Sequence, residues 1–145
     1  MSVHFHYADV AAIPLNGKRK IKQAVEALFA EEKKALKELR YIFCTDEYLL
    51  KINRQFLNHD DYTDIITFDL SEKESEVNGE IYISIDRVAE NAGKFKTTYD
   101  RELHRVIFHG ALHLCGLRDK KPAEQKAMRA AEDAALEGWY AGKSQ

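Results

Sequence analysis

Hydrophobic and polar residues alternate along the chain with two different spacings, and each spacing predicts its own kind of element. Apolar residues such as Ile21, Val25 and Phe29 recur at the three- and four-residue intervals of an amphipathic helix. The same reasoning along the chain predicts helices over residues 16–39, 46–58, 86–95, 100–116 and 121–142. Short runs rich in β-branched and aromatic residues predict strands over residues 3–9, 40–45, 63–70 and 80–85.

Several residues at the ends of these elements are typical start and stop signals. Asp46 and Asp100 are placed to cap the helices that they precede, because a side-chain oxygen there can accept a hydrogen bond from a free backbone N–H. Pro122 suits the first turn of the last helix, and Gly116 can end the helix before it. The polar stretch 71–79 is expected to be a loop with a turn at Asn78-Gly79, so the two strands around it should pair as a hairpin.

The order of elements is β-α-β-α-β-β-α-α-α, which predicts one α+β domain over residues 1–145, a small mixed β-sheet packed with helices. A length of 145 residues suits one domain with its own core, and a composition of 45% hydrophobic and 32% charged residues is ordinary for a globular protein. The net charge of −2 argues against broad, non-specific adsorption to nucleic acid, although it allows a local basic patch.

The sequence also indicates where in the cell the protein is expected. The N-terminal stretch has neither the basic flank nor the apolar centre of a signal peptide, and no apolar run approaches the roughly 20 residues that a membrane span needs. A cytoplasmic protein is therefore expected. Cys44 and Cys115 lie in separate apolar segments and are expected to be free, buried thiols.

The stretch HGALHLCGLRDK contains the pattern that points to chemistry. His109 and His113 lie four residues apart, so both imidazoles can face one point from the same side of a helix. Gly116 can turn the chain back, and Asp119 can then approach that point from the other side. Two histidines and a carboxylate are a common set of zinc ligands. The helix lacks the glutamate base of the H-E-x-x-H zinc proteases, because Gly110 stands in its place.

Three stretches carry a resemblance to a known family. HGALHLCGLRD is similar to H-G-x-L-H-L-x-G-[aromatic]-D-H, the signature of the YbeY family of bacterial metal-dependent endoribonucleases, which are rRNA maturation factors. LNHDDYTDIITFD, from Leu57 to Asp69, resembles the family's T-[DN]-[VI]-[LI]-[ST]-F segment, and GEIYIS, from Gly79 to Ser84, resembles its G-D-I-x-I-S strand. The resemblance follows nearly the whole chain in the same order.

This resemblance implies a compact α+β fold with a metal-binding helix like that of the zinc proteases. It implies one zinc ion held by three ligands, here His109, His113 and Asp119. It also implies cleavage of single-stranded RNA, maturation of the small-subunit ribosomal RNA and a part in ribosome quality control. The expected partners are single-stranded RNA and the ribosome, with no membrane and no DNA.

The chain departs from the family pattern at three positions. Asp119 replaces the family's third histidine and remains an acceptable zinc ligand. Arg118 replaces the aspartate that usually precedes that histidine. Leu57 occupies the position where many members carry an active-site arginine. Arg54, one helical turn earlier, is the candidate catalytic residue that could stand in for it, although an exposed arginine is often only a solvated charge.

Further candidates concern substrate binding and proton transfer. Five cations near the predicted site could form a local basic rim for RNA or could simply be solubilising charges: Lys94, Lys96, Arg118, Lys120 and Lys121. The general base could be a metal hydroxide, a ribose hydroxyl acting as internal nucleophile, or Asp64.

Two alternative functions remain open from the sequence. A metallopeptidase-like hydrolase would use the same ligand spacing, but Gly110 argues against it. A non-catalytic ribosome-associated factor with a structural metal would explain the missing arginine at Leu57.

Overall fold

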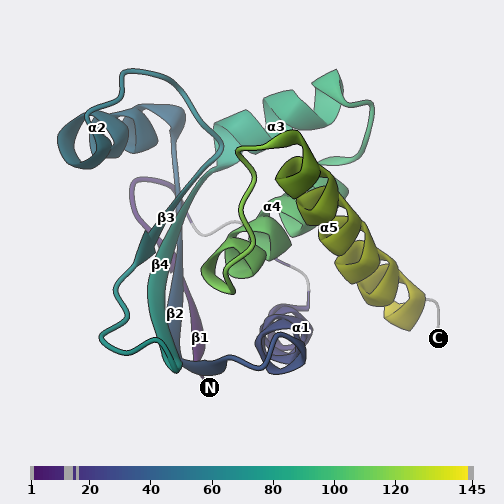
Figure 1. Ribbon diagram of the computed structural model, residues 1–145. Helices are drawn as coiled ribbons and strands as arrows, with labels where there is room; N and C mark the ends of the chain where they lie inside the picture. Colours follow the sequence, from purple (N-terminus) through teal and green to yellow (C-terminus); the bar gives the residue numbers. More distant parts are fainter. Residues whose placement is uncertain (1, 12–14, 16, 144–145) are drawn as a thin grey trace.

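A four-stranded mixed sheet forms the centre of the fold in the computed structural model, which describes residues 2–11, 15 and 17–143. Its strands lie in the order β1-β2-β4-β3, with β1, β2 and β4 parallel and β3 antiparallel to β4 (Figure 1). The elements along the chain are β1 (Val3–Tyr7), α1 (Lys18–Glu31), β2 (Ala35–Cys44), α2 (Asp46–Leu57), β3 (Ile65–Asp69), β4 (Glu76–Ser84), α3 (Ile85–Lys94), α4 (Tyr99–Leu114) and α5 (Pro122–Lys143). The predicted α+β class, the mixed sheet and the hairpin of the last two strands are confirmed.

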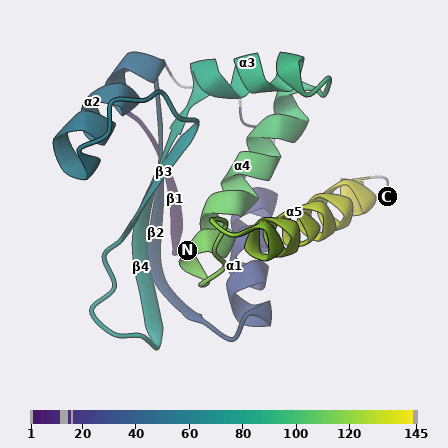
Figure 2. The ribbon, with the colours of Figure 1, turned by 45° about the horizontal axis from the view of Figure 1, so that its top comes forward.

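Helices cover both faces of this sheet, but unequally. α1 and α4 cover one face, and α5 lies on the far side of α4, whereas α2 lies against the opposite face (Figure 2). The larger core lies under α4, where Tyr41 and Phe108 are fully buried and the Tyr41 hydroxyl donates a hydrogen bond of 2.8 Å to the carbonyl of Ile107. This arrangement places α4 between the sheet and α5. The sides of α4 that contact neither the sheet nor α5 remain available for a site.

The docking of α5 on α4 uses one stripe of buried positions, Met128, Glu132, Leu136 and Trp139. Their spacing of three and four residues puts them on one side of the helix. Three of the four are apolar, as expected of a packed helix face, and Glu132 is a carboxylate that is only 2% exposed. A buried carboxylate needs charged or hydrogen-bonding partners, and these lie on α4.

The predicted helix over residues 16–39 was too long. α1 ends at Glu31, Lys33 adopts a left-handed conformation with φ 58°, and β2 begins at Ala35. Residues after Ala35 form part of the sheet because β2 pairs along its whole length with the parallel strand β4, and this long-range pairing overrides the local helical preference of the charged segment. Asn16, the first residue of the predicted helix, lies outside the described residues.

Both predicted aspartate caps were wrong by one or two residues. Thr45 and Thr98 are the N-caps of α2 and α4, and each hydroxyl accepts a hydrogen bond from a backbone N–H three residues later. Asp46 and Asp100 lie instead in the first turns, where a negative charge interacts favourably with the helix dipole. Asp46 also accepts a 2.6 Å hydrogen bond from the Ser84 hydroxyl, which ties the start of α2 to the end of β4.

The predicted turn at Asn78-Gly79 was also wrong, because both residues lie inside β4. Gly79 pairs with Leu39 in the sheet. A Cβ atom at Gly79 would lie 2.8 Å from Leu114 Cδ1 and 3.1 Å from the Phe68 carbonyl oxygen. The glycine therefore lets the end of α4 approach the sheet closely, and it does not serve to reverse the chain.

Cys44 and Cys115 are free and buried, as predicted. Burial raises the pKa of each thiol to about 12, so both are protonated and poorly nucleophilic at neutral pH. Among the described residues, none of the helices combines the length and the apolar character that crossing a membrane requires.

Candidate metal centre

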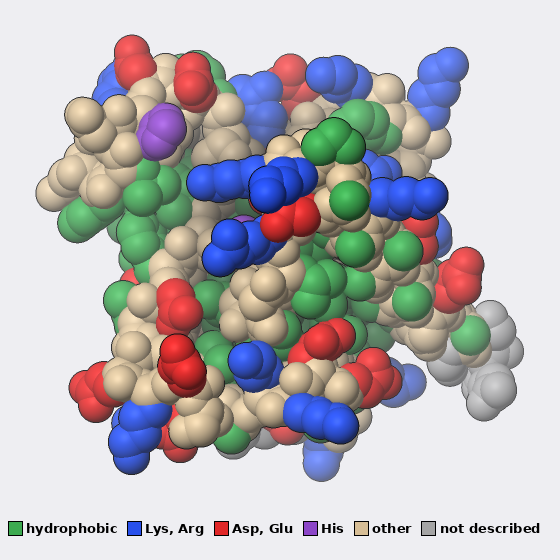
Figure 3. Space-filling view, viewed as in Figure 1, with side chains coloured by type: hydrophobic (Ala, Val, Ile, Leu, Met, Phe, Trp, Pro, Cys, Tyr) green, Lys and Arg blue, Asp and Glu red, His purple; other side chains and the backbone are tan. Residues whose placement is uncertain are grey.

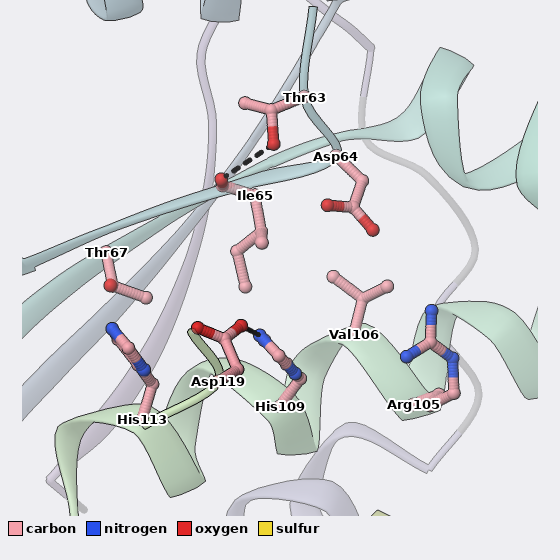
Figure 4. Close-up of a pocket in the computed structure, with 9 residues that line it drawn as sticks. All are labelled: Thr63, Asp64, Ile65, Thr67, Arg105, Val106, His109, His113 and Asp119. Carbon is pink, nitrogen blue, oxygen red and sulfur yellow. Dashed lines mark hydrogen bonds and ion pairs between the residues drawn. The ribbon is translucent and has the colours of Figure 1, made fainter. Parts of the chain in front are cut away.

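A cavity of about 350 Å³ lies between α4, the start of β3 and the segment that follows α4 (Figure 4). Two of the three predicted metal ligands come from α4, and the third comes from the segment after it. The residues that line the cavity are Thr63, Asp64, Ile65, Thr67, Arg105, Val106, His109, His113 and Asp119. The structure therefore brings His109, His113 and Asp119, which the sequence singled out, to one cavity.

The helical spacing of the two histidines puts both rings on the same side of α4. The ring planes of His109 and His113 are within 6° of parallel, and their centroids lie 6.3 Å apart. Successive turns of one helix stack side chains in this way. The local geometry thus follows directly from the four-residue separation.

Gly116 ends α4 with a sharp turn, as predicted. Its φ of +107° is a conformation that residues with a Cβ atom rarely adopt. The turn brings the carbonyl oxygen of Leu117 to 3.0 Å from His113 Nδ1. A carbonyl can only accept, so Nδ1 of His113 carries the proton and its Nε2 lone pair is left for a metal.

The same turn carries Asp119 back toward the other histidine. Its Oδ2 atom lies 3.5 Å from His109 Nε2, and the two side chains point toward each other in Figure 4. On the opposite side of the ring, His109 Nδ1 lies 2.5 Å from Glu132 Oε2. A carboxylate on Nδ1 orients the ring and increases the basicity of Nε2, the arrangement found around histidine ligands of zinc.

Glu132 belongs to α5 and was not identified from the sequence. Its other oxygen accepts a hydrogen bond of 2.9 Å from Arg105, which is in turn bound to Glu102. The one signal in the sequence was a carboxylate at a position that packs with Met128 and Leu136 on the buried side of α5. Such a residue is expected to have a polar partner, but the sequence does not say which one.

This network changes the proton affinity of His109. Burial by itself lowers the pKa of His109, but the hydrogen bond to Glu132 and the nearby charges of Glu132, Asp119 and Asp64 outweigh it, so the pKa is raised. Burial would raise the pKa of Glu132, whereas its bonds to His109 and Arg105 lower it. A metal ion must displace the proton from His109, so metal affinity should increase as the pH rises.

As placed, the three predicted ligands do not converge on one point. Among the described residues, no group of three His, Cys, Asp or Glu side chains lies close enough together to hold a metal ion. Figure 4 shows the ring of His113 directed toward Thr67, apart from the pair formed by His109 and Asp119. The donor types nevertheless fit a divalent metal, since all three side chains line one cavity and the partners at Nδ1 of His109 and His113 leave each Nε2 as the donor atom.

The two arginines that matter here lie in different places. Arg54, the predicted catalytic residue, is 57% exposed at the end of α2, is paired with Asp60 and does not line the cavity. Arg105 lines the cavity and was not identified from the sequence. Its hydrogen bonds to Glu102 and Glu132 fix the guanidinium at the cavity wall, and they raise its pKa even though burial alone would lower it.

The wall opposite α4 comes from the start of β3 and the residues before it. Asp64 directs its carboxylate into the cavity there, and Thr67 lies further along β3 (Figure 4). Burial raises the pKa of Asp64, although the charges of Arg105 and His109 act in the opposite direction. A carboxylate with a raised pKa is a better proton acceptor than an exposed one.

Lys and Arg side chains gather on the face shown in Figure 3, over the segment between α4 and α5. This segment carries Arg118, Lys120 and Lys121, and all three are exposed. Lys94 and Lys96, the other two cations of the predicted basic rim, are also exposed at the end of α3. All five cations of the predicted basic rim are therefore accessible to a ligand. Asp119 lies between two of them, Arg118 and Lys120, in the segment that joins α4 to α5.

Gly110 explains why the helix has no glutamate after its first histidine. A Cβ atom at this position would lie 2.9 Å from both Ile65 Cδ1 and Ile81 Cδ1. The position therefore faces the sheet and not the cavity, and any larger side chain would push α4 away from β3 and β4.

Replacing Gly110 by alanine should lower the free energy of unfolding by roughly 1 kcal/mol, because an overpacking cost of about 1–3 kcal/mol outweighs the gain of about 1 kcal/mol in helix propensity. Urea denaturation of both proteins measures the difference. Gly138→Ala in α5 is the matched control, since a Cβ atom there meets nothing within 4 Å, and it should be neutral or slightly stabilising. Equal stability of the Gly110→Ala variant and the parent would contradict the close packing.

Comparison with known proteins gives one consistent result. The family model described as Endoribonuclease YbeY matches residues 7–140. Proteins named Endoribonuclease YbeY from Cytophaga hutchinsonii and Phocaeicola vulgatus are 48% and 55% identical to the chain, covering 91% and 71% of it and 92% and 74% of their own lengths. A solution structure from Thermotoga maritima superposes with a TM-score of 0.67 at 27% identity, covering 98% of this chain and 92% of its own. The family model and the sequence identities therefore show that the chain belongs to the Endoribonuclease YbeY family.

Proposed function

We propose that this protein is a metal-dependent endoribonuclease that cleaves single-stranded RNA and acts in the maturation of small-subunit ribosomal RNA and in ribosome quality control. The observation that supports this most directly is the cavity itself, which joins two imidazoles, a carboxylate and a fixed arginine in a chain whose relatives are named endoribonucleases. Ribosomal RNA and the ribosome are the proposed partners, in the cytoplasm.

The proposed cofactor is one zinc ion, held by His109, His113 and Asp119. A bound zinc ion supplies Lewis-acid polarisation of a phosphoryl oxygen. The role of the protein is to present donors of the right kind, and the partners of the histidines do so by holding both Nδ1 protons. Three protein ligands on an accessible cavity are typical of a catalytic zinc site, whereas structural sites are closed by four.

Two further side chains suit cleavage of a phosphodiester. Arg105 presents a guanidinium whose charge is fixed at the cavity wall, and it would stabilise the negative charge that develops on the phosphoryl oxygens. Asp64 lies on the opposite wall, where its carboxylate would accept the proton of the attacking hydroxyl or water. The two groups thus face the same space from opposite sides.

The alternative functions are less well supported by the geometry. A peptidase of the H-E-x-x-H type needs a glutamate that reaches the cavity, but position 110 is packed against the sheet. A purely structural metal site would be closed to solvent, whereas His113 is exposed and the side chain of Asp119 is 40% exposed.

The decisive experiment is an RNA cleavage assay on the purified protein with and without a chelator, beside a casein assay. We expect cleavage of a single-stranded substrate that is abolished by the chelator and restored by zinc. The His109→Ala variant, purified in parallel, controls for contaminating nucleases. Equal cleavage by that variant, or cleavage that survives the chelator, would overturn the proposal.

Of the two arginines, Arg105 should matter more for cleavage than Arg54. We expect Arg105→Lys to slow cleavage by at least tenfold, about 1.4 kcal/mol in the barrier, because a lysine keeps the charge but loses the fork that Glu102 and Glu132 orient. Arg54→Ala should slow it by less, with an unchanged metal content. The reverse order of rates would return the catalytic role to Arg54.

The accessible cations between α4 and α5 should contribute to RNA affinity. Replacing Arg118, Lys120 and Lys121 together by glutamine should weaken RNA binding, most strongly at low salt, without unfolding the protein. A filter-binding titration at several salt concentrations measures the effect. Unchanged affinity would mean that these residues are only solubilising charges.

A further inference from the structure

A second, smaller cavity of about 180 Å³ lies beside the candidate metal centre. Phe95, Arg101 and Arg129 contribute to its walls, and Arg105 lines both this cavity and the first one. A polymer with one phosphodiester in the first cavity could therefore place a neighbouring nucleotide in the second. Apart from Arg105, none of the residues given a part in metal binding or catalysis lines the second cavity.

Phe95 lines this second cavity and is 54% exposed, although its side chain is large and apolar. The backbone around it is held firmly, since its N–H donates to the carbonyl of Asn91 at 2.8 Å and the N–H of Thr97 donates to the carbonyl of Ala92 at 2.9 Å. Lys96 between them adopts a left-handed conformation with φ 55°. The ring is thus presented to solvent by a fixed turn, and an exposed aromatic face is a platform on which a nucleobase can stack.

Three arginines and two acidic residues line the second cavity together with Phe95. The Arg101 guanidinium lies over the ring of Tyr140, 5.3 Å from its centroid, and the side chain of Arg129 is 66% exposed. Lys94 and Lys96 flank Phe95 in the sequence and are exposed. Two of the nearby acidic residues already have arginine partners: Glu102 is hydrogen-bonded to Arg105, and Glu132 lies 3.9 Å from Arg129. Asp133 also lines the cavity.

From this arrangement we propose that the second cavity is a nucleotide subsite for single-stranded RNA. In this subsite Phe95 stacks an unpaired base, while Arg101 and Arg129 contact the adjoining phosphates. The inference rests on the proposed function, because it assigns a place to a nucleotide beside the bond that is cleaved. A single strand is required, because a base in a duplex is not free to stack on a side chain.

Equilibrium binding tests this without depending on cleavage. The probe is a fluorescein-labelled 2′-O-methyl oligouridylate of about 12 nucleotides, a usual length for a single-strand site, and its integrity is checked on a gel after each anisotropy titration. Phe95→Ala should weaken binding by about tenfold, the effect of losing one stacked base. Phe95→Trp should bind at least as well as the parent, and Phe95→Leu, which is apolar but has no ring, should resemble Phe95→Ala.

An abasic oligomer of the same length separates stacking from a general loss of affinity. If Phe95 stacks a base, Phe95→Ala should bind the abasic oligomer as well as the parent does, so the tenfold effect disappears in this double comparison. Phe56→Ala is the matched control, because Phe56 is 62% exposed but lines neither cavity, and it should bind both oligomers like the parent.

The proposed phosphate contacts are tested separately, by the salt dependence of RNA affinity. Replacing both Arg101 and Arg129 by glutamine should reduce the slope of log affinity against log salt by about 1.4, the value for two phosphate contacts on a single strand. Arg19→Gln, an exposed residue of α1, should leave the slope unchanged.

The outcomes distinguish this subsite from the proposed function. Parent-like affinity of Phe95→Ala for the oligouridylate would overturn the subsite, while metal-dependent RNA cleavage by the same protein would leave the proposed function intact. A Phe95→Ala effect that persists on the abasic oligomer would overturn the subsite as well. A parent protein that neither binds nor cleaves RNA would overturn both.

Discussion

The Asp119→Ala variant should lose most of its bound zinc and all measurable RNA cleavage. Asp119 is the predicted third ligand, and its carboxylate lies 3.5 Å from His109 Nε2 at the mouth of the cavity. Two histidines alone make a weak site, so removing the carboxylate should lower metal occupancy sharply. Elemental analysis of the purified variants, with parallel cleavage assays, measures both effects.

The Asp119→His variant makes this prediction specific to a ligand. A histidine restores the residue type that the family signature carries at this position, so zinc and cleavage should both be retained. Asp133→Ala is the control for loss of an acidic side chain in the same region, and it should keep its zinc because Asp133 does not line the first cavity. Full zinc occupancy in Asp119→Ala would show that the carboxylate is only a loop residue.

The second large effect is expected at Glu132, which touches no substrate. Glu132→Ala should weaken metal binding by roughly 10–100-fold, the usual consequence of removing a carboxylate that orients a histidine ligand. The same change frees Arg105 from one of its two carboxylate partners, so cleavage should fall further than metal occupancy does. Competition with a chelator measures the first quantity, and cleavage at saturating metal measures the second.

A conservative variant separates orientation from simple packing. Glu132→Gln keeps the size and one acceptor oxygen, so its metal affinity should lie between those of the parent and Glu132→Ala. Glu137→Gln, an exposed carboxylate on the same helix, should leave both quantities unchanged. If Glu132→Ala lowers the melting temperature while metal affinity and cleavage rate at low temperature stay at parent values, Glu132 has only a structural role.

The parts of the site that the sequence predicted are those set by local geometry. His109, His113 and the turn at Gly116 lie within eight positions of one another, and the period of a helix with a left-handed glycine at its end determines where each points. Both rings lie on one side of α4, and Asp119 returns to within 3.5 Å of His109 Nε2. The Asp119 and Glu132 variants test whether these donors bind one metal ion.

The parts that were missed depend on long-range packing. Glu132 is 23 positions from His109, and only the docking of α5 on α4 brings their side chains together. Arg105 is indistinguishable in the sequence from other charged residues on a helix, and its place at the cavity wall follows from its two buried carboxylate partners.

The same cause explains the errors in the fold. Residues from Ala35 onward follow a charged helical segment, but their pairing with β4 decides their conformation. Gly79 was predicted to be a turn residue, whereas the approach of Leu114 to the sheet is what requires a glycine there. The order and type of the elements are encoded locally, while their ends depend on partners that the sequence does not reveal.

The place of Glu132 in the middle of the docking stripe of α5 couples the site to the motions of that helix. A transient detachment of α5 from α4 would take away the partner of His109 in the same event, even if the sheet and its core stayed folded. By reciprocity, a ligand that binds His109 in its oriented form must favour the docked helix by the same free energy. Loading of the site should therefore slow amide hydrogen exchange along α5, although this helix supplies none of the proposed metal ligands.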